Sequence, residues 1–277
     1  MDENTSRLLN RFSDYLQGRE RSPATVEKYC RDVRAYLAFA GGEPTRENAL
    51  AYKTALVARY HPRGVNSRIA ALNACFRMLG REELCLRQVR TQRAAYLPEE
   101  RCLTREEYFA LLDAAERQGN ARLLLTLQAV CATGIRIGEL PYVTVEAAVR
   151  GEATVFCKGK MRRVLLPTAL CERLLAYATA EGIAAGPILL TACGRPVDRS
   201  NVWREMKTLA LLSGVEPAKV FPHNLRHLFA RCFYEEARDI VRLADVLGHT
   251  SIDTTRIYLA STGKEHRRTL ERLALLK

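Results

Sequence analysis

The chain has 277 residues, 48% of them hydrophobic, which is enough for one large or two modest domains with sizeable cores. Its 43 Lys and Arg against 31 Asp and Glu give a formal net charge of +12, which favours a polyanionic partner, although a merely basic surface is the alternative. No apolar run is long enough to span a bilayer, and no signal peptide is recognisable, so we expect a cytoplasmic protein without a membrane partner. The nine cysteines include no C-x-x-C pair and indicate neither a disulfide framework nor a zinc site.

The first 86 residues predict a bundle of helices. Apolar residues recur at helical spacing from Leu8 to Leu16 and from Val26 to Phe39. A third helix is expected over about 45–60 and a fourth over about 66–79, with residues 61–64 as the turn between them. This segment predicts an N-terminal domain, 1–86.

Residues 87–101 predict a linker. Four arginines are scattered along it, and Pro98 would break any helix. Such a segment suits a basic strap across a DNA backbone, and an ordinary solvated linker is the alternative. We therefore place a second domain at 102–277.

The second domain begins with helical patterns. Thr104 and Glu107 form a capping box, and helices are expected over about 105–117 and 120–132. Gly134 ends the second helix and presents Arg136 on the next turn. Glu139, three residues further on, could pair with Arg136 and orient it, or form an ordinary surface ion pair.

From about Ala147 the pattern changes to strands. Residues 152–157 and 161–166 flank Lys158-Gly159-Lys160 and predict a hairpin with a lysine at its tip. A helix is expected from Pro167 to about Ala180. Another should begin at Asp198 or Ser200.

Residues 222–258 combine side chains that suit phosphodiester chemistry. A helix starting at Pro222 carries His223 and Arg226, three residues apart and so on one side of the helix. A second apolar helix stops at Gly248, His249 follows on the turn, and Ser251 can cap a short helix carrying Tyr258. A guanidinium fork matches a phosphate, imidazole moves protons near neutral pH, and a phenol can attack phosphorus. Each residue alone has an ordinary structural explanation, so the combination is what indicates the function.

The combination resembles the tyrosine recombinase (phage integrase) family. The matching segments are H-x-x-R at 223–226, L-G-H at 247–249, a tyrosine nine residues after that histidine, T-G-x-R-x-x-E-L at 133–140, and the lysine hairpin at 156–160. The order and spacing of these five segments agree with the family. The resemblance implies a mainly α fold with a small β-sheet, built from an N-terminal helical core-binding (SAM-like) domain and a C-terminal α+β catalytic domain.

The resemblance also implies a reaction and its residues. A site-specific recombinase or integrase would cleave and rejoin DNA through a 3′-phosphotyrosyl intermediate and a Holliday junction, without metal or other cofactor. Tyr258 would attack the phosphate that Arg136 and Arg226 hold, and Lys158, or alternatively Lys160, would protonate the leaving oxygen. His223 would assist proton transfer, and His249 would donate a hydrogen bond to the phosphate.

Partners follow from the same resemblance. Double-stranded DNA is expected to contact basic and polar side chains, for each of which a solvated side chain is the alternative: Arg63, Asn66, Ser67, Arg68, Arg77, Arg90, Arg93 and Lys160. The apolar and basic tail after Tyr258 would pack on its own domain or dock on a neighbouring subunit, which would close a cyclic homotetramer.

Two other functions compete with recombination. One is a type IB topoisomerase-like relaxing enzyme, which shares the phosphotyrosine chemistry but acts as a monomer without a defined site. The other is a non-catalytic DNA-binding protein of the same fold, which six filled catalytic positions argue against. A small-molecule enzyme is disfavoured because the sequence has no glycine-rich nucleotide loop.

Overall fold

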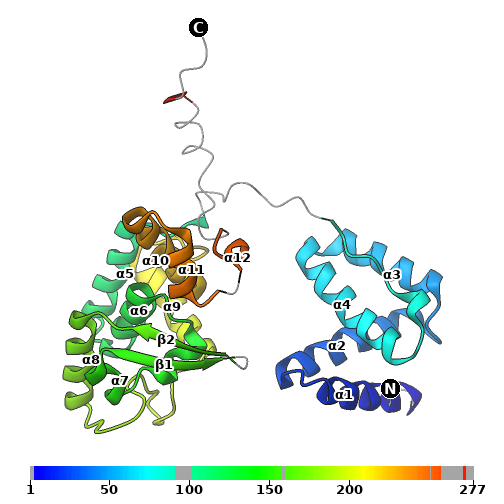
Figure 1. Ribbon diagram of the computed structural model, residues 1–277, viewed down its shortest axis with the longest axis horizontal. Coiled ribbons are helices and arrows are strands. Elements are labelled where there is room, and N and C mark those ends of the chain that lie inside the picture. Colours follow the sequence, from blue (N-terminus) through cyan, green and yellow to red (C-terminus); the bar gives the residue numbers. More distant parts are fainter. Residues whose placement is uncertain (1–2, 91–100, 158–159, 250, 257–270, 273–277) are drawn as a thin grey trace. The chain divides into compact units, whose positions relative to one another are not determined.

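The computed structural model describes residues 3–90, 101–157, 160–249, 251–256 and 271–272, with the backbone alone at residues 157 and 160. The chain forms two compact units, Met1–Arg93 and Ala94–Lys277 (Figure 1). The division falls within the segment predicted as a linker. Each unit has its own hydrophobic core and is described separately.

The N-terminal unit is a four-helix bundle, blue to cyan in Figure 1. Its elements are α1 (Glu3–Gly18), α2 (Pro23–Ala40), α3 (Arg46–Arg59), α4 (Pro62–Met78) and the 3-10 turn η1 (Glu82–Leu84). α2 packs on the other three helices, and Phe12, Tyr36 and Phe76 lie almost fully buried between them. The helical N-terminal domain predicted from apolar periodicity is thus present.

The turn predicted at residues 61–64 was wrong, because α4 already begins at Pro62. Proline suits the first turn of a helix, where its missing N–H would have no intrahelical partner. His61 caps the helix, its Nδ1 accepting from Arg63 N at 3.4 Å. Gly64 therefore lies inside a helix, and Arg63 lies in its first turn.

The chain after η1 runs back along α4 and is held by two asparagines. The side-chain amide of Asn73 binds both backbone groups of Leu86. Its Nδ2 donates to Leu86 O at 2.9 Å, and its Oδ1 accepts from Leu86 N at 2.8 Å. Asn66 bonds Val89 in the same way, at 2.9 and 2.7 Å. The start of the predicted linker is thus fixed to the N-terminal unit.

The C-terminal unit begins with helices around a leucine-rich core. Its first elements are α5 (Arg105–Arg117), α6 (Ala121–Thr133), the 3-10 segment η3 (Ile137–Tyr142) and α7 (Val145–Arg150). The predicted capping box of Thr104 and Glu107 is confirmed. α6 lies at the centre, where it packs against α5, α8 and α10.

α7 corrects the expectation that strands begin at about Ala147. Thr144 caps this short helix by accepting from Ala147 N, and Gly151 ends it in the left-handed conformation. The hairpin follows as β1 (Glu152–Cys157) and β2 (Lys160–Leu165), in antiparallel register with Val155 opposite Arg162. Alternation buries Ala153, Val155 and Val164 and leaves the other face exposed.

The remaining helices carry most of the predicted site. They are α8 (Thr168–Ala180), α9 (Arg199–Ser213), α10 (Pro222–Ala237), α11 (Ile240–Leu247) and α12 (Ile252–Arg256). α10 packs on α6, and α11 lies between α10 and α12 (Figure 1). The mainly helical fold with one small sheet is as predicted. No helix in the described part of the chain is long and apolar enough to cross a membrane.

Candidate active site

The segment around Arg136 is built by the end of α6. Gly134 ends that helix at φ +64°, and a Cβ there would lie 2.5 Å from the Phe229 ring of α10. Thr133 Oγ1 donates to Ala129 O and accepts from Ile135 N, so the threonine stabilises the turn. The local sequence thus directs Arg136 out of the core while its apolar neighbours stay buried.

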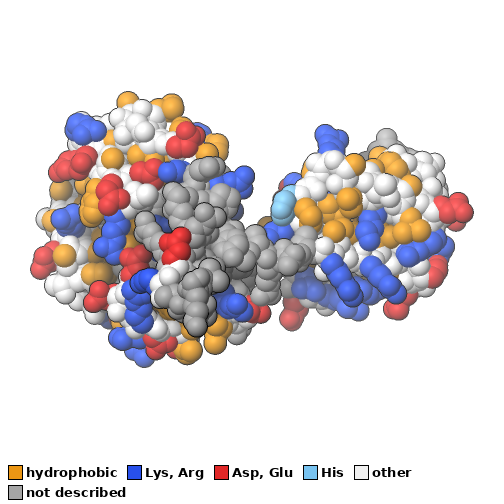
Figure 2. All heavy atoms as spheres, turned by 90° about the horizontal axis from the view of Figure 1, so that it is seen from above, with side chains coloured by type: hydrophobic (Ala, Val, Ile, Leu, Met, Phe, Trp, Pro, Cys, Tyr) orange, Lys and Arg blue, Asp and Glu red, His pale blue; other side chains and the backbone are white. Residues whose placement is uncertain are grey.

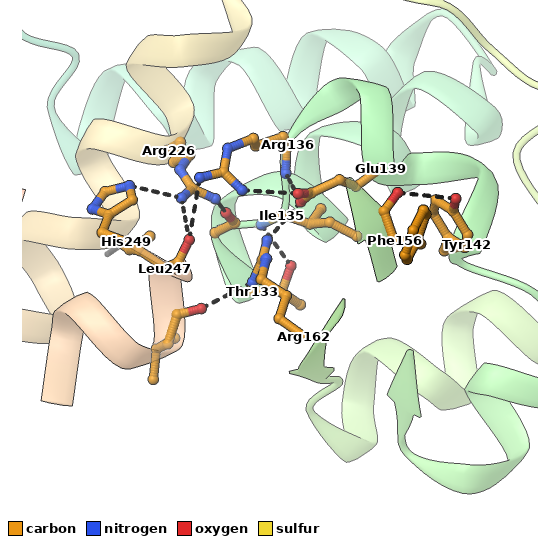
Figure 3. A network of polar contacts seen from close by, with 12 residues as sticks. Thr133, Ile135, Arg136, Glu139, Tyr142, Phe156, Arg162, Arg226, Leu247 and His249 are labelled. Carbon is orange, nitrogen blue, oxygen red and sulfur yellow. Dashed lines mark hydrogen bonds and ion pairs between the residues drawn. The ribbon is translucent and has the colours of Figure 1, made fainter. Parts of the chain in front are cut away.

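Arg226 is buried and turned towards the same place. Only 2% of the residue is exposed, and its Nη1 donates to the Gly134 carbonyl. Its Nη2 donates to Leu247 O at 2.7 Å. Arg136 Nη2 contacts the same carbonyl at 3.4 Å (Figure 3). Two guanidiniums from segments 90 residues apart therefore meet at one oxygen.

His249 completes this group on the turn after α11. Its Nε2 lies 3.2 Å from Arg226 Nη2, and its Nδ1 lies 3.0 Å from the hydroxyl of the buried Thr255. A guanidinium only donates hydrogen bonds, so Nε2 accepts and the proton is on Nδ1. Gly248 adopts φ +64°, which gives the turn its shape.

Glu139 links Arg136 to Arg162. The Glu139 side chain is 2% exposed and accepts from Arg136 Nη1 at 2.8 Å and from Arg136 N at 2.9 Å. Arg162 of β2 donates to the same carboxylate at 2.5 Å and to Val246 O at 3.0 Å (Figure 3). The predicted Arg136–Glu139 pair is confirmed, and it is a buried network rather than a surface pair.

Burial and the cations around the site lower the pKa values of its histidines. Burial, followed by Arg226 and Arg136, lowers the pKa of His249 to about 4. His223 lies at the start of α10 beside the ring of His227, with centroids 4.7 Å apart. Burial and then Arg226, Arg199 and Arg136 lower the pKa of His223. Both imidazoles are therefore neutral at pH 7 before an anion binds.

The structure brings four of the six predicted catalytic residues into one region: Arg136, His223, Arg226 and His249. Lys158 and Tyr258 lie outside the described residues, as does Arg93, and the side chain of Lys160 is not described. The cap expected at Ser251 is present, since its Oγ accepts from Asp253 N at 3.2 Å.

Sequence reasoning missed Arg162 and Thr255. A signal for Arg162 existed: with the hairpin in register, it shares the buried face of β2 with Val164. A charged residue in such a place needs a partner. Thr255 follows His249 by six residues in a polar segment, and nothing in the sequence distinguishes it from Thr254.

The predicted DNA contacts of the N-terminal unit divide into two kinds. Arg63, Arg77 and Arg90 are exposed, and Figure 2 shows several Lys and Arg side chains on this unit's surface. Arg68 lies over the Tyr60 ring at 4.0 Å and donates to Gly64 O, and Asn66 binds Val89. Ser67 is half-buried. Exposure thus favours the three arginines as contacts.

The geometry defines a class of site. Three guanidiniums, one neutral imidazole and a single buried carboxylate belong to one network of contacts, so the group keeps an excess of positive charge. The Arg136 side chain is still 40% exposed. Such a group suits a tetrahedral oxyanion such as a phosphodiester. The fold and the site together define the class of enzymes that transfer DNA strands.

Comparison with known proteins agrees with this class. Residues 101–265 match the phage integrase family, and residues 9–83 match the phage integrase N-terminal SAM-like domain. Tyrosine recombinase XerA of Thermococcus kodakarensis is 30% identical, over 98% of this chain and 96% of that protein. Tyrosine recombinase XerD of Halalkalibacterium halodurans is 28% identical, over 84% and 86%. The chain belongs to the phage integrase family, that of the tyrosine recombinases.

Solved structures share the fold at low identity. A lambda integrase dimer bound to a COC′ core site has a TM-score of 0.73 at 19% identity, covering 91% of this chain and 94% of that one. XerH site-specific recombinase bound to palindromic difH substrate has a TM-score of 0.72 at 18% identity, covering 99% and 89%. The architecture, with a helical N-terminal domain and an integrase domain, is therefore that of known recombinases.

Proposed function

We propose that this tyrosine recombinase is a site-specific enzyme that cleaves and rejoins DNA strands through a 3′-phosphotyrosyl intermediate. The observation that carries the proposal is the convergence of Arg136 and Arg226 on the Leu247 carbonyl, with His249 beside them. Relatives with nearly the same length are named tyrosine recombinases, which supports strand exchange as the activity.

Each predicted catalytic side chain has one role in cleavage. The Tyr258 oxygen bonds to phosphorus while the bond from phosphorus to the 5′ oxygen breaks. The phenol proton passes towards His223, and Lys158, or Lys160, supplies a proton to the leaving 5′ oxygen. Arg136 and Arg226 hold the non-bridging oxygens and stabilise the added negative charge. The phosphotyrosyl bond conserves the energy of the phosphodiester, so attack by a 5′ hydroxyl rejoins a strand without a nucleotide cofactor.

His249 needs a proton before it can donate to the phosphate through Nε2. In the structure that atom accepts from Arg226, and the Nδ1 proton is directed at Thr255. An arriving phosphate supplies negative charge, which raises the pKa of a nearby imidazole. DNA binding and protonation of His249 are therefore coupled in this mechanism.

The proposal includes an assembly on DNA in the cytoplasm. The exposed arginines of the N-terminal unit bind the DNA backbone, and basic side chains there add salt-sensitive affinity. Four copies exchange strands through a Holliday junction, each C-terminal tail docking on a neighbour so that the ring closes. Integrases of the same fold support this arrangement, since lambda integrase has been solved as a tetramer bound to a Holliday junction.

Covalent trapping tests the reaction. The protein is incubated in EDTA with a nicked duplex containing its recombination site, from which the cleaved fragment diffuses away, and adducts are resolved on a denaturing gel. We expect an adduct with the wild type and none with Tyr258→Phe. An adduct that persists in Tyr258→Phe, or its absence in the wild type on every duplex from the native locus, would contradict the proposal.

A plasmid assay with the same protein distinguishes recombination from relaxation. A recombinase exchanges flanks only between two copies of its site, whereas a topoisomerase-like enzyme relaxes supercoiled plasmid that lacks the site. We expect recombinant products to require both sites. Relaxation of a site-free plasmid at the rate of a site-containing one would favour the topoisomerase-like function instead.

A further inference from the structure

Arg162 occupies an unusual place for a charged residue. It lies on the buried face of β2, opposite Val155, and only 14% of its side chain is exposed. Its guanidinium donates to Glu139 Oε2 at 2.5 Å and to Val246 O at 3.0 Å. One side chain therefore joins the hairpin, the Arg136 segment and the last turn of α11 (Figure 3).

The charges of Arg136, Glu139 and Arg162 explain why two arginines face one carboxylate. Glu139 is almost fully buried and orients Arg136 through both of its oxygens. A single carboxylate facing Arg136 alone would neutralise it, and the buried pair would offer little charge to a phosphate. With Arg162 on the same carboxylate, two cations face one anion, and the group keeps one positive charge. Hydrogen bonds from Arg136 and Arg162 offset the effect of burial and lower the pKa of Glu139, so it is ionised at neutral pH.

The second contact of Arg162 fixes the turn that carries His249. Its Nη1 donates to Val246 O. Its Cδ packs so closely against Gly248 that a Cβ on that glycine would lie 2.3 Å from it. The next carbonyl, Leu247 O, is the one on which Arg136 and Arg226 meet. Arg162 is therefore packed against the turn that holds the two other guanidiniums together.

We propose that Arg162 is a positioning residue for DNA cleavage: by holding Glu139 and Val246, it keeps Arg136 oriented towards the scissile phosphate without neutralising it. The inference rests on the proposed function and adds to it a residue that does not touch the DNA. A merely structural ion pair would affect folding and every substrate alike, whereas this role depends on the negative charge of the phosphate.

The test compares two substrates that differ in that charge. Single-turnover cleavage is measured on the nicked duplex with an ordinary scissile phosphodiester and with a methylphosphonate, in which one non-bridging oxygen is replaced by a methyl group. The variants are Arg162→Gln, which removes the charge, and Arg163→Gln as the matched control. Arg163 is the next residue of β2 and points to solvent, with a side chain 74% exposed near Glu152.

We expect Arg162→Gln to slow cleavage of the phosphodiester by about 10²-fold, within the range seen when a transition-state donor is lost. The same variant should slow cleavage of the neutral substrate less than about tenfold, because its transition state carries one negative charge fewer. Arg163→Gln should stay within about twofold of the wild type on both. Equal slowing of both substrates by Arg162→Gln, or rates equal to those of Arg163→Gln, would overturn the inference.

Arg162→Lys covers the case in which Arg162→Gln does not fold, as judged by its thermal unfolding. Lysine keeps the charge but lacks the planar fork that reaches two acceptors. We expect a smaller loss with the same preference for the neutral substrate, and equal loss on both substrates would again overturn the inference. A wild type that forms no adduct on the phosphodiester refutes the proposed function itself, and the inference with it.

Discussion

At the scale of single residues, His249 shows how the site is held before DNA arrives. Its imidazole lies between Arg226 and Thr255, and burial together with the positive groups around it keeps it neutral. The pKa of about 4 lies below the ordinary value of 6.5. In the unfolded chain the same imidazole takes up a proton at about pH 6.5.

This difference makes stability depend on pH. Between pH 6.5 and about 4 the unfolded state binds a proton that the folded state does not, so acidification favours unfolding. We expect the urea midpoint of the C-terminal unit to be lower at pH 5 than at pH 7.5, and to fall less in His249→Asn, which cannot titrate. An equal fall in wild type and variant, measured by far-ultraviolet circular dichroism, would show that His249 is not the cause.

Gly248 is the second residue whose change has a defined outcome. A Cβ at this position would meet Arg162 Cδ at 2.3 Å, and φ +64° is unfavourable for other residues. Gly248→Ala should cost about 1–3 kcal/mol of unfolding free energy. It should also slow cleavage, because it moves the turn. Gly138→Ala is the control, since that position has open space and should change stability by less than about 0.5 kcal/mol. A Gly248→Ala protein as stable as the control would contradict this packing.

At the scale of elements, most segments could be predicted from the sequence because periodicity and end signals agree. α6 is an example: Asn120 caps it, apolar residues fill its buried face, and Gly134 ends it. The errors arose where a local signal has two meanings. The pattern of residues 61–64 predicts a turn, but Pro62 begins α4, and the short α7 lies in a segment too brief for a helical period to show.

The contact of Asn66 with the chain that returns along α4 predicts how a substitution there affects stability. Because its amide binds both backbone groups of Val89, Asn66→Ala should destabilise the N-terminal unit by about 1–3 kcal/mol. The affinity of this variant for DNA should be unchanged at temperatures where the unit stays folded.

Arg63→Ala should do the opposite: unfolding is unaffected, while the slope of log affinity against log salt becomes shallower by about 1. Filter binding at several salt concentrations, with thermal unfolding of both variants, checks this. A loss of DNA affinity at all salt concentrations in folded Asn66→Ala would instead make that residue a DNA contact.

At the scale of the whole molecule, the site is assembled from segments far apart in the chain. The H-x-x-R, L-G-H and T-G-x-R-x-x-E-L segments could be placed together only through the family resemblance, because periodicity says nothing of which helices meet. The structure supplies the physical reason: Arg226 reaches the Gly134 carbonyl and Leu247 O, joining all three. The hairpin pattern indicates that Arg162 is buried and needs a partner, but its partners could not be predicted, since they depend on the course of α11 and on the position of Glu139.

The central claim is that a phenol attacks a phosphate held by two guanidiniums, and the attachment site tests it most directly. The trapped adduct is digested with nuclease and protease, and the modified peptide is sequenced by mass spectrometry. The account predicts one modified residue, Tyr258, joined to the 3′ phosphate of the cleaved strand. A nucleotide on any other residue, or a link through a 5′ phosphate, would contradict it.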